Sequence, residues 1–202
     1  MHDFDRDYWQ QHWQSATRQT QSGQIPPNPY LTAVAKQLAP GTALDAGCGA
    51  GTESRLLAEE GWQVTGADIS AEALTVAASL AAQAGQNGVT WLEADLSTWE
   101  PDDQFDLVTS SYAHPATSHA EFYARLASWV RAGGTLLIVG HLHHHGPEAE
   151  IPEQAQVSLD EMTRALDEHW RIEVAAPHTR QVSTPAGVKT LHDVVLQATR
   201  LE

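Results

Sequence analysis

The chain has 202 residues, of which 42% are hydrophobic, and 26 Asp and Glu against 11 Lys and Arg give a net charge of −15. This length suits one α/β domain with a sizeable core. The acidic balance disfavours a nucleic-acid partner, because phosphate binding depends on Lys and Arg, and it favours a small-molecule substrate. No apolar run matches a membrane span and no signal-peptide pattern opens the chain, so we expect a cytoplasmic protein without a membrane partner.

The first predicted element is a helix over residues 4–18 with an aromatic face. A polar stretch and an extended segment through Pro27 follow it. Asn28 then serves as an N-cap, with Pro29 at the first position of a helix that runs to about Leu38. We therefore divide the chain into an N-terminal helical segment, 1–39, and a main domain, 40–202.

The main domain alternates short apolar runs with helical patterns. Strands are predicted at 42–46, 63–68, 89–93, 105–110, 134–140, 171–175 and 188–198, and helices at 52–60, 71–84, 119–131 and, after a capping-box sequence, from Ser158 to about His169. Alternation of strands and helices indicates a parallel sheet covered on both faces. The last two strands flank a Pro/Gly loop, which predicts an antiparallel hairpin.

The most informative stretch is Asp45-Ala46-Gly47-Cys48-Gly49-Ala50-Gly51, where the first strand runs directly into a helix. Glycine permits unusual dihedrals and close approach of a ligand to the backbone, and a helix N-terminus offers free N–H groups. The spacing Gly-x-Gly-x-Gly differs from the Gly-x-Gly-x-x-Gly fingerprint of dinucleotide binders. The run resembles the first motif of class I S-adenosylmethionine-dependent methyltransferases.

Later segments resemble the following motifs of that family in the same order. They are Asp68 with Ile69 at the end of the second strand, Asp95 with Leu96 after the third, Phe105-Asp106-Leu107-Val108 in the fourth, and Val130 to Thr135, a Pro-Gly-Gly-like turn with Ala132 in place of proline. The resemblance covers residues 40–200. It implies an α/β, Rossmann-like, doubly wound, seven-stranded sheet that is mostly parallel with a C-terminal antiparallel hairpin.

The resemblance also implies S-adenosylmethionine as the cofactor. A carboxylate at Asp68 can accept hydrogen bonds from both ribose hydroxyls, and Ser70 is the better candidate for the helix cap that Asp68 would otherwise provide. In the family, Ile69 would lie against the adenine, and Asp95 and Leu96 would bind its amino group and a ring nitrogen. The expected cofactor-binding residues are Asp45, Ala46, Gly47, Cys48, Gly49, Gly51, Asp68, Ile69, Asp95, Leu96 and Ser110.

The methyl acceptor is expected to lie beyond the fourth and fifth strands, against the N-terminal helix. His114 is the candidate catalytic base, and a solvent-exposed loop histidine is the alternative interpretation. The N-terminal segment resembles the lid of small methyltransferases of the thiopurine and tellurite-resistance type, while packing on the core or a homodimer contact remains open. The expected pocket residues are Tyr8, Trp9, Trp13, Tyr112, His114 and His141.

Four imidazoles between His141 and His145, with Glu148 and Glu150 nearby, raise the question of a metal site. Ligands so close in sequence rarely converge on one ion without a supporting shell of hydrogen-bonded groups. We therefore expect no metal here.

The resulting hypothesis is a methyltransferase that acts on a small-molecule acceptor, with the methylated atom left open. A sulfonium carries its methyl group already activated, so the protein mainly has to align an acceptor and exclude water. A non-catalytic S-adenosylmethionine-binding protein is one alternative. A nicotinamide-dependent oxidoreductase is another, which the glycine spacing and the absence of a Tyr-x-x-x-Lys pair disfavour.

Overall fold

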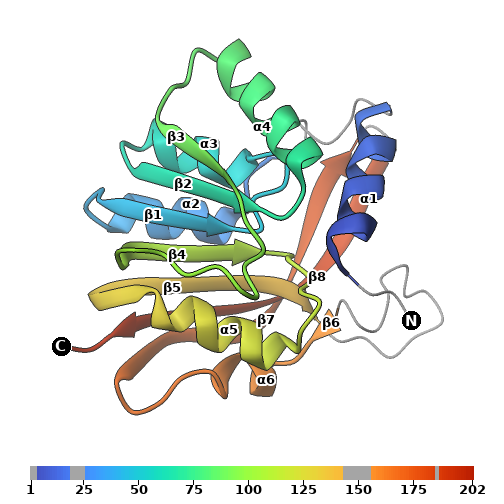
Figure 1. Ribbon diagram of the computed structural model, residues 1–202. Coiled ribbons are helices and arrows are strands. Elements are labelled where there is room, and N and C mark those ends of the chain that lie inside the picture. Colours follow the sequence, from blue (N-terminus) through green and yellow to red (C-terminus); the bar gives the residue numbers. More distant parts are fainter. Residues whose placement is uncertain (1–3, 19–25, 143–155, 185–186) are drawn as a thin grey trace.

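The computed structural model describes residues 4–18, 26–142, 156–184 and 187–202 (Figure 1). Its strands are β1 (Thr42–Ala46), β2 (Gln63–Asp68), β3 (Val89–Glu93), β4 (Phe105–Ser111), β5 (Val130–Leu142), β6 (Gln156–Val157), β7 (Trp170–Thr184) and β8 (Gly187–Arg200). Its helices are α1 (Arg6–Arg18), α2 (Pro29–Gln37), α3 (Thr52–Glu59), α4 (Ala71–Gln83), α5 (His119–Ser128) and α6 (Leu159–Thr163).

The strands form one sheet in the order β3-β2-β1-β4-β5-β8-β7, and β6 pairs with β5. Strands β1 to β5 are mutually parallel, while β8 runs antiparallel to β5 and β7 antiparallel to β8. The chain fills one half of the sheet from β1 outward and then returns to β4. The carboxyl ends of β1 and β4 therefore form the switch point, where open α/β sheets bind ligands.

Apolar side chains alternate between the two faces of the central strands. On β4, Leu107 packs with the helix residues Leu31 and Leu57, and its neighbour Val108 packs on the opposite face with Phe122 and Leu126. Helices α2 and α3 thus cover one face and α5 and α6 the other, as the positions of these helices in Figure 1 illustrate. Such burial is the main favourable term in folding, at about 25 cal/mol per Å² of apolar surface.

The predicted fold class is confirmed, and the elements differ from the sequence expectation mainly at their ends. Helix α6 ends at Thr163 rather than near His169, and the chain then turns at Asp167, whose carboxylate accepts a hydrogen bond from the His169 amide just before β7. Strand β5 begins at Val130, which already pairs with Phe105, so α5 stops earlier than expected. The two-residue strand β6 carries too little pattern to be predicted.

No helix in the described part of the chain is long and apolar enough to cross a membrane. The described ranges also contain no group of three or more His, Cys, Asp or Glu side chains arranged to hold a metal ion. Of the histidine cluster, only His141 lies in those ranges, and His143 to His145, Glu148 and Glu150 lie outside the described residues.

Candidate active site

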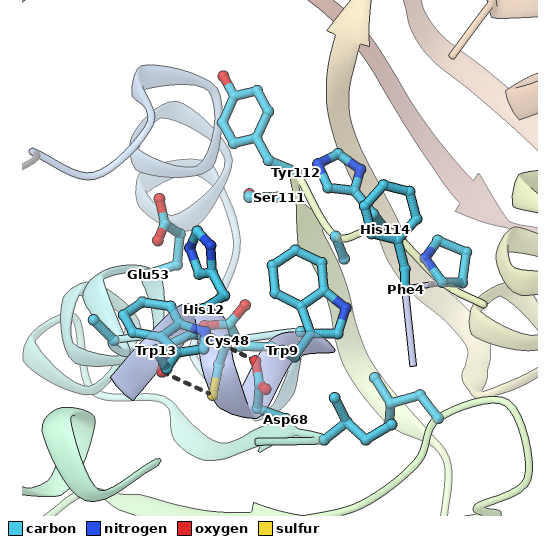
Figure 2. Close-up of a pocket in the computed structure, with 18 of the residues that line it drawn as sticks. Phe4, Trp9, His12, Trp13, Cys48, Glu53, Asp68, Ser111, Tyr112 and His114 are labelled. Carbon is cyan, nitrogen blue, oxygen red and sulfur yellow. Dashed lines mark hydrogen bonds between the residues drawn. The ribbon is translucent and has the colours of Figure 1, made fainter. Parts of the chain in front are cut away.

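A cavity of about 630 Å³ lies at the carboxyl ends of the central strands, at the switch point, with α1 against it (Figure 2). Its lining includes the glycine loop after β1, the ends of β2, β3 and β4, the start of α3, α1 with the residues just before it, and one residue of β7. A cavity of this size suits a small ligand or cofactor. The sides of the cavity differ in their chemistry.

The glycine loop forms the floor of the cavity. Gly47 and Gly49 line it with φ of 77° and 52°, a left-handed region that favours glycine. A Cβ on Gly47 would lie 2.7 Å from the Cβ of Ala113, and one on Gly49 would lie 2.9 Å from Cζ2 of Trp13. Cys48 also lines the cavity, with burial raising the pKa of its thiol.

Two members of the predicted motif lie behind this floor. Ala46 is fully buried, and neither it nor Gly51 is among the lining residues. Gly51 has a φ of 71°, in the left-handed region, and a Cβ at this position would also overlap the indole of Trp91. Both residues therefore affect the conformation of the loop without lining the cavity.

Asp68 holds the loop in place from the end of β2. Its Oδ2 accepts a hydrogen bond from the Gly49 amide at 2.9 Å, and its Oδ1 accepts one from the Ser70 amide, also at 2.9 Å. Ser70 is the N-cap of α4, as predicted, since its hydroxyl accepts from the Ala73 amide. Each carboxylate oxygen retains a second acceptor position, and Asp68 lines the cavity.

The wall beyond Asp68 contains the residues expected to face an adenine. Ile69, Asp95 and Leu96 all line the cavity. Asp95 accepts hydrogen bonds at Oδ1 from the amide and the hydroxyl of Ser97, at 2.9 and 2.6 Å, which fixes its side chain in a turn. The ends of β2 and β3 thus contribute two apolar side chains and two carboxylates to the lining of the cavity.

Buried carboxylates give the cavity an unusual electrostatic character. Burial, reinforced by the charge of Glu53, raises the pKa of Asp45 to about 7, although the Ser54 hydroxyl donates to it at 2.6 Å. Burial likewise raises the pKa values of Glu53 and Asp68. A cation beside these three buried acidic groups would stabilise their ionised forms, so the cavity favours a cationic ligand.

The raised pKa of Asp45 predicts a pH-dependent stability. Between about pH 4 and pH 7 the native carboxyl keeps a proton that the unfolded chain releases, so the free energy of unfolding falls as the pH rises. We expect the wild type to lose up to about 4 kcal/mol relative to Asp45→Asn across this range. Denaturant unfolding at several pH values measures it, with the exposed Asp102→Asn as control. A wild-type difference from Asp45→Asn that stays constant with pH would contradict the prediction.

Helix α1 lies against the cavity with its aromatic face inward. Phe4, Trp9 and Trp13 line the cavity, and the Trp9 ring stacks on His114 at a centroid distance of 6.0 Å. The helix is attached to the main domain by an ion pair between Arg6 and Glu93. The predicted pocket residue Tyr8 is not among the lining residues, and its ring contacts Phe4 and Trp9 instead.

The predicted acceptor residues gather beyond β4. His114 and Tyr112 line the cavity, and His141 lies behind them, its ring 4.5 Å from that of Tyr112 and 5.7 Å from that of His114. Burial lowers the pKa of His114 to about 3 and that of His141 to about 4, and each imidazole has a buried Nδ1 without a hydrogen-bond partner in the described structure. Ser110 lies outside the lining, because its hydroxyl donates to the Ala46 carbonyl.

A polar wall of the cavity contains residues that no sequence motif predicts. Asn28, Glu53 and Arg180 line the cavity, and Figure 2 shows Glu53 on one side with His114 and Phe4 on the other. The sequence predicts Asn28 as a helix cap, a role that it also fills. Arg180 belongs to no motif, so only the course of the hairpin brings it here.

Comparison with known proteins agrees with this geometry. A family described as a methyltransferase domain matches residues 43–134. Trans-aconitate 2-methyltransferase from Azoarcus sp. is 30% identical over 152 residues, which cover 70% of this chain and 58% of that protein. The enzyme of the same name from Rhizobium rhizogenes is 33% identical over 99 residues, covering 48% and 37%. The chain thus spans less than two thirds of the length of these relatives.

Solved structures show the same fold. Magnesium protoporphyrin IX methyltransferase from Synechocystis, with bound SAH, has a TM-score of 0.71 and 22% identity, covering 96% of this chain and 97% of that one. TehB from Haemophilus influenzae has a TM-score of 0.69 and 16% identity, covering 87% and 62%.

The glycine loop, the acidic ends of β2 and β3 and the sheet order define a class I methyltransferase fold. The family match over residues 43–134 likewise makes the chain similar to a methyltransferase domain. The cofactor of this class is S-adenosylmethionine, as predicted.

Proposed function

We propose that the chain transfers a methyl group from S-adenosylmethionine to a small-molecule acceptor. The observation that carries the proposal is the convergence of the glycine loop, the Asp68 carboxylate and the His114 imidazole on one cavity. The names of the relatives, trans-aconitate 2-methyltransferase, support a small acceptor, as does the net charge of −15, which disfavours a nucleic acid. A cytoplasmic location and a homodimer remain predictions.

The residues present fit the cofactor. Gly47 and Gly49 let a ligand approach the backbone, Asp68 has acceptor positions for two ribose hydroxyls, and Ile69 offers an apolar surface to a base. The buried carboxylates of Asp45 and Glu53 favour a positively charged group. When bound, the cofactor supplies a methyl group activated by a sulfonium, so the chain has to orient the acceptor and exclude water.

We propose that the N-terminal segment, 1–39, acts as a lid on this cavity. Trp13 lies against Gly49 on the cofactor side, and Trp9 stacks on His114 on the acceptor side. The Ser70 hydroxyl also donates to Oε1 of Gln10 at 3.2 Å, which ties the helix to the start of α4. A helix that contacts both sides of the cavity is placed to exclude water during transfer.

We propose that His114 orients the acceptor. Its low pKa keeps the imidazole neutral at physiological pH, so it can accept a hydrogen bond from a hydroxyl or thiol. The same low pKa means that it holds a proton weakly. The imidazole therefore takes up the acceptor's proton only as the methyl bond forms.

A methyl-transfer assay tests the proposed function. The protein is incubated with S-adenosylmethionine carrying a labelled methyl group and a panel of thiols, alcohols, amines and carboxylic acids, with trans-aconitate included. We expect label in at least one product, with stoichiometric formation of S-adenosylhomocysteine. Binding of the cofactor without transfer to any acceptor class would instead favour a non-catalytic binding protein.

A further inference from the structure

The polar wall of the cavity contains a guanidinium held in a fixed position. Arg180 of β7 has a side chain that is only 16% exposed. Its Nε donates to Oδ2 of Asp193 at 2.7 Å, and its Nη2 donates to the Tyr112 hydroxyl at 2.9 Å. A planar guanidinium bonded at two of its nitrogens has little freedom to turn.

The partners of Arg180 are themselves fixed. Asp193 of β8 is fully buried, and it accepts hydrogen bonds from the hydroxyls of Tyr112, at 2.7 Å, and Tyr30, at 3.1 Å. Burial and the Asp193 charge raise the pKa of Tyr30 to about 12, so this phenol remains a donor at neutral pH. The network joins α2, the segment just after β4 and the hairpin, and it fixes the orientation of Arg180.

The third nitrogen of the guanidinium is left for a ligand. Nη1 of Arg180 has no hydrogen-bond partner among the described residues, and Arg180 lines the cavity. The same wall contains the Glu53 carboxylate, which accepts hydrogen bonds from the amide and the side chain of Asn28 at 3.2 and 3.4 Å. A fixed cation and a fixed carboxylate in one wall complement a ligand that carries both charges.

The other sides of the cavity indicate which part of the cofactor lies against the polar wall that contains Arg180 and Glu53. Asp68 and Asp95 fit a nucleoside, and the rings of Phe4, Trp9 and His114 form the acceptor side. If the nucleoside part of a ligand binds at Asp68, an amino-acid part attached to it extends across the glycine loop. Its ammonium and carboxylate groups then lie beside the polar wall. An amino-acid zwitterion in an apolar setting needs both charges paired.

We propose that Arg180 binds the carboxylate of the methionine part of the cofactor and that Glu53 binds its ammonium group. This inference rests on the proposed function. It gives the C-terminal hairpin a part in recognition, by which the site separates nucleosides that carry an amino acid from those that lack one. Asp193, Tyr112 and Tyr30 act as positioning residues for the guanidinium.

Calorimetric titration with two nucleosides tests the proposal. S-adenosylhomocysteine carries the amino-acid group, and 5′-methylthioadenosine is a thioether of the same nucleoside without it. We expect Arg180→Met to weaken S-adenosylhomocysteine binding by about 10- to 100-fold, as loss of a charge-assisted pair does. Its affinity for methylthioadenosine should stay within about 3-fold of the wild type. The matched control is Arg171→Met on the same strand, whose side chain is 62% exposed, and it should change neither affinity.

A second variant distinguishes a loss of binding from a loss of folding stability. Loss of Arg180 alone leaves the buried Asp193 carboxylate without its cation, which is destabilising. The double variant Arg180→Met/Asp193→Asn removes both charges, and it should show the same selective loss. Unchanged S-adenosylhomocysteine affinity in both variants, or an equal loss for both nucleosides, would overturn the assignment of Arg180. A wild type that binds neither nucleoside would instead overturn the proposed function.

Discussion

Replacement of Asp68 by alanine is expected to weaken the binding of S-adenosylhomocysteine by about 100-fold or more. The Asp68 carboxylate is expected to accept hydrogen bonds from two ribose hydroxyls, and it also accepts one from the Gly49 amide. Hydrogen bonds to charged groups contribute roughly 1.5–3 kcal/mol each, and 1.4 kcal/mol is a factor of ten in affinity. Loss of the carboxylate therefore removes contacts to the ligand and loosens the glycine loop. Calorimetry with the purified variant measures the effect.

Two controls separate these contributions. Asp68→Asn keeps the shape and one acceptor oxygen, so we expect an intermediate loss of affinity. Asp95→Ala removes a carboxylate from the adenine side, where it is already bonded to Ser97, and should cost less than Asp68→Ala. An Asp68→Ala variant that folds and binds S-adenosylhomocysteine with wild-type affinity would remove Asp68 from the ribose site.

Replacement of His114 by phenylalanine is expected to lower kcat by about 100-fold, within the range that a positioned acid or base contributes. Phenylalanine keeps the ring that Trp9 and Phe4 contact, so the wall of the cavity is preserved while the hydrogen-bond acceptor is lost. The affinity for S-adenosylhomocysteine should change by less than about 3-fold, because His114 is on the acceptor side. Steady-state kinetics with the acceptor found in the transfer assay measures kcat.

The pH profile provides a second readout for His114. Burial and the charges of His141 and His119 lower its pKa to about 3, so the rate should not fall as the pH is lowered from about 7.5 to 5.5. His114→Asn restores an acceptor oxygen without a titrating group and should recover part of kcat. If kcat of His114→Phe stays within about 3-fold of the wild type, His114 has no role in transfer.

The sequence was most informative where one local pattern determined one element. Asn28-Pro29 and Ser70 predicted helix starts at which the structure shows capped helices, because a cap is a local interaction. The end of α6 was not predictable in this way, since it depends on a turn at Asp167 and on Trp170 packing on the core. Likewise, β5 starts early because β4 pairs with it.

The residues of the candidate site also fall into two groups, those that a local sequence pattern predicts and those that it does not. The glycine loop, Asp68 and Asp95 stand next to strand ends, so their spacing in the sequence predicted their presence at one edge of the sheet. Arg180 lies far along the chain in a strand whose pattern resembles any exposed hairpin. Its place in the cavity follows from the pairing of β7 with β8, which brings Arg180 next to Asp193. Long-range pairing of this kind leaves no local signal.

The cavity built on Gly47 to Gly51 and Asp68 is proposed as the site for S-adenosylmethionine. Calorimetric titration of the wild-type protein with S-adenosylhomocysteine tests it most directly, with a nicotinamide dinucleotide titrated in parallel. We predict one site per chain with a dissociation constant in the micromolar range, about −8 kcal/mol at 1 μM, and no heat from the dinucleotide. Saturable binding of the dinucleotide, with none of S-adenosylhomocysteine, would contradict the claim.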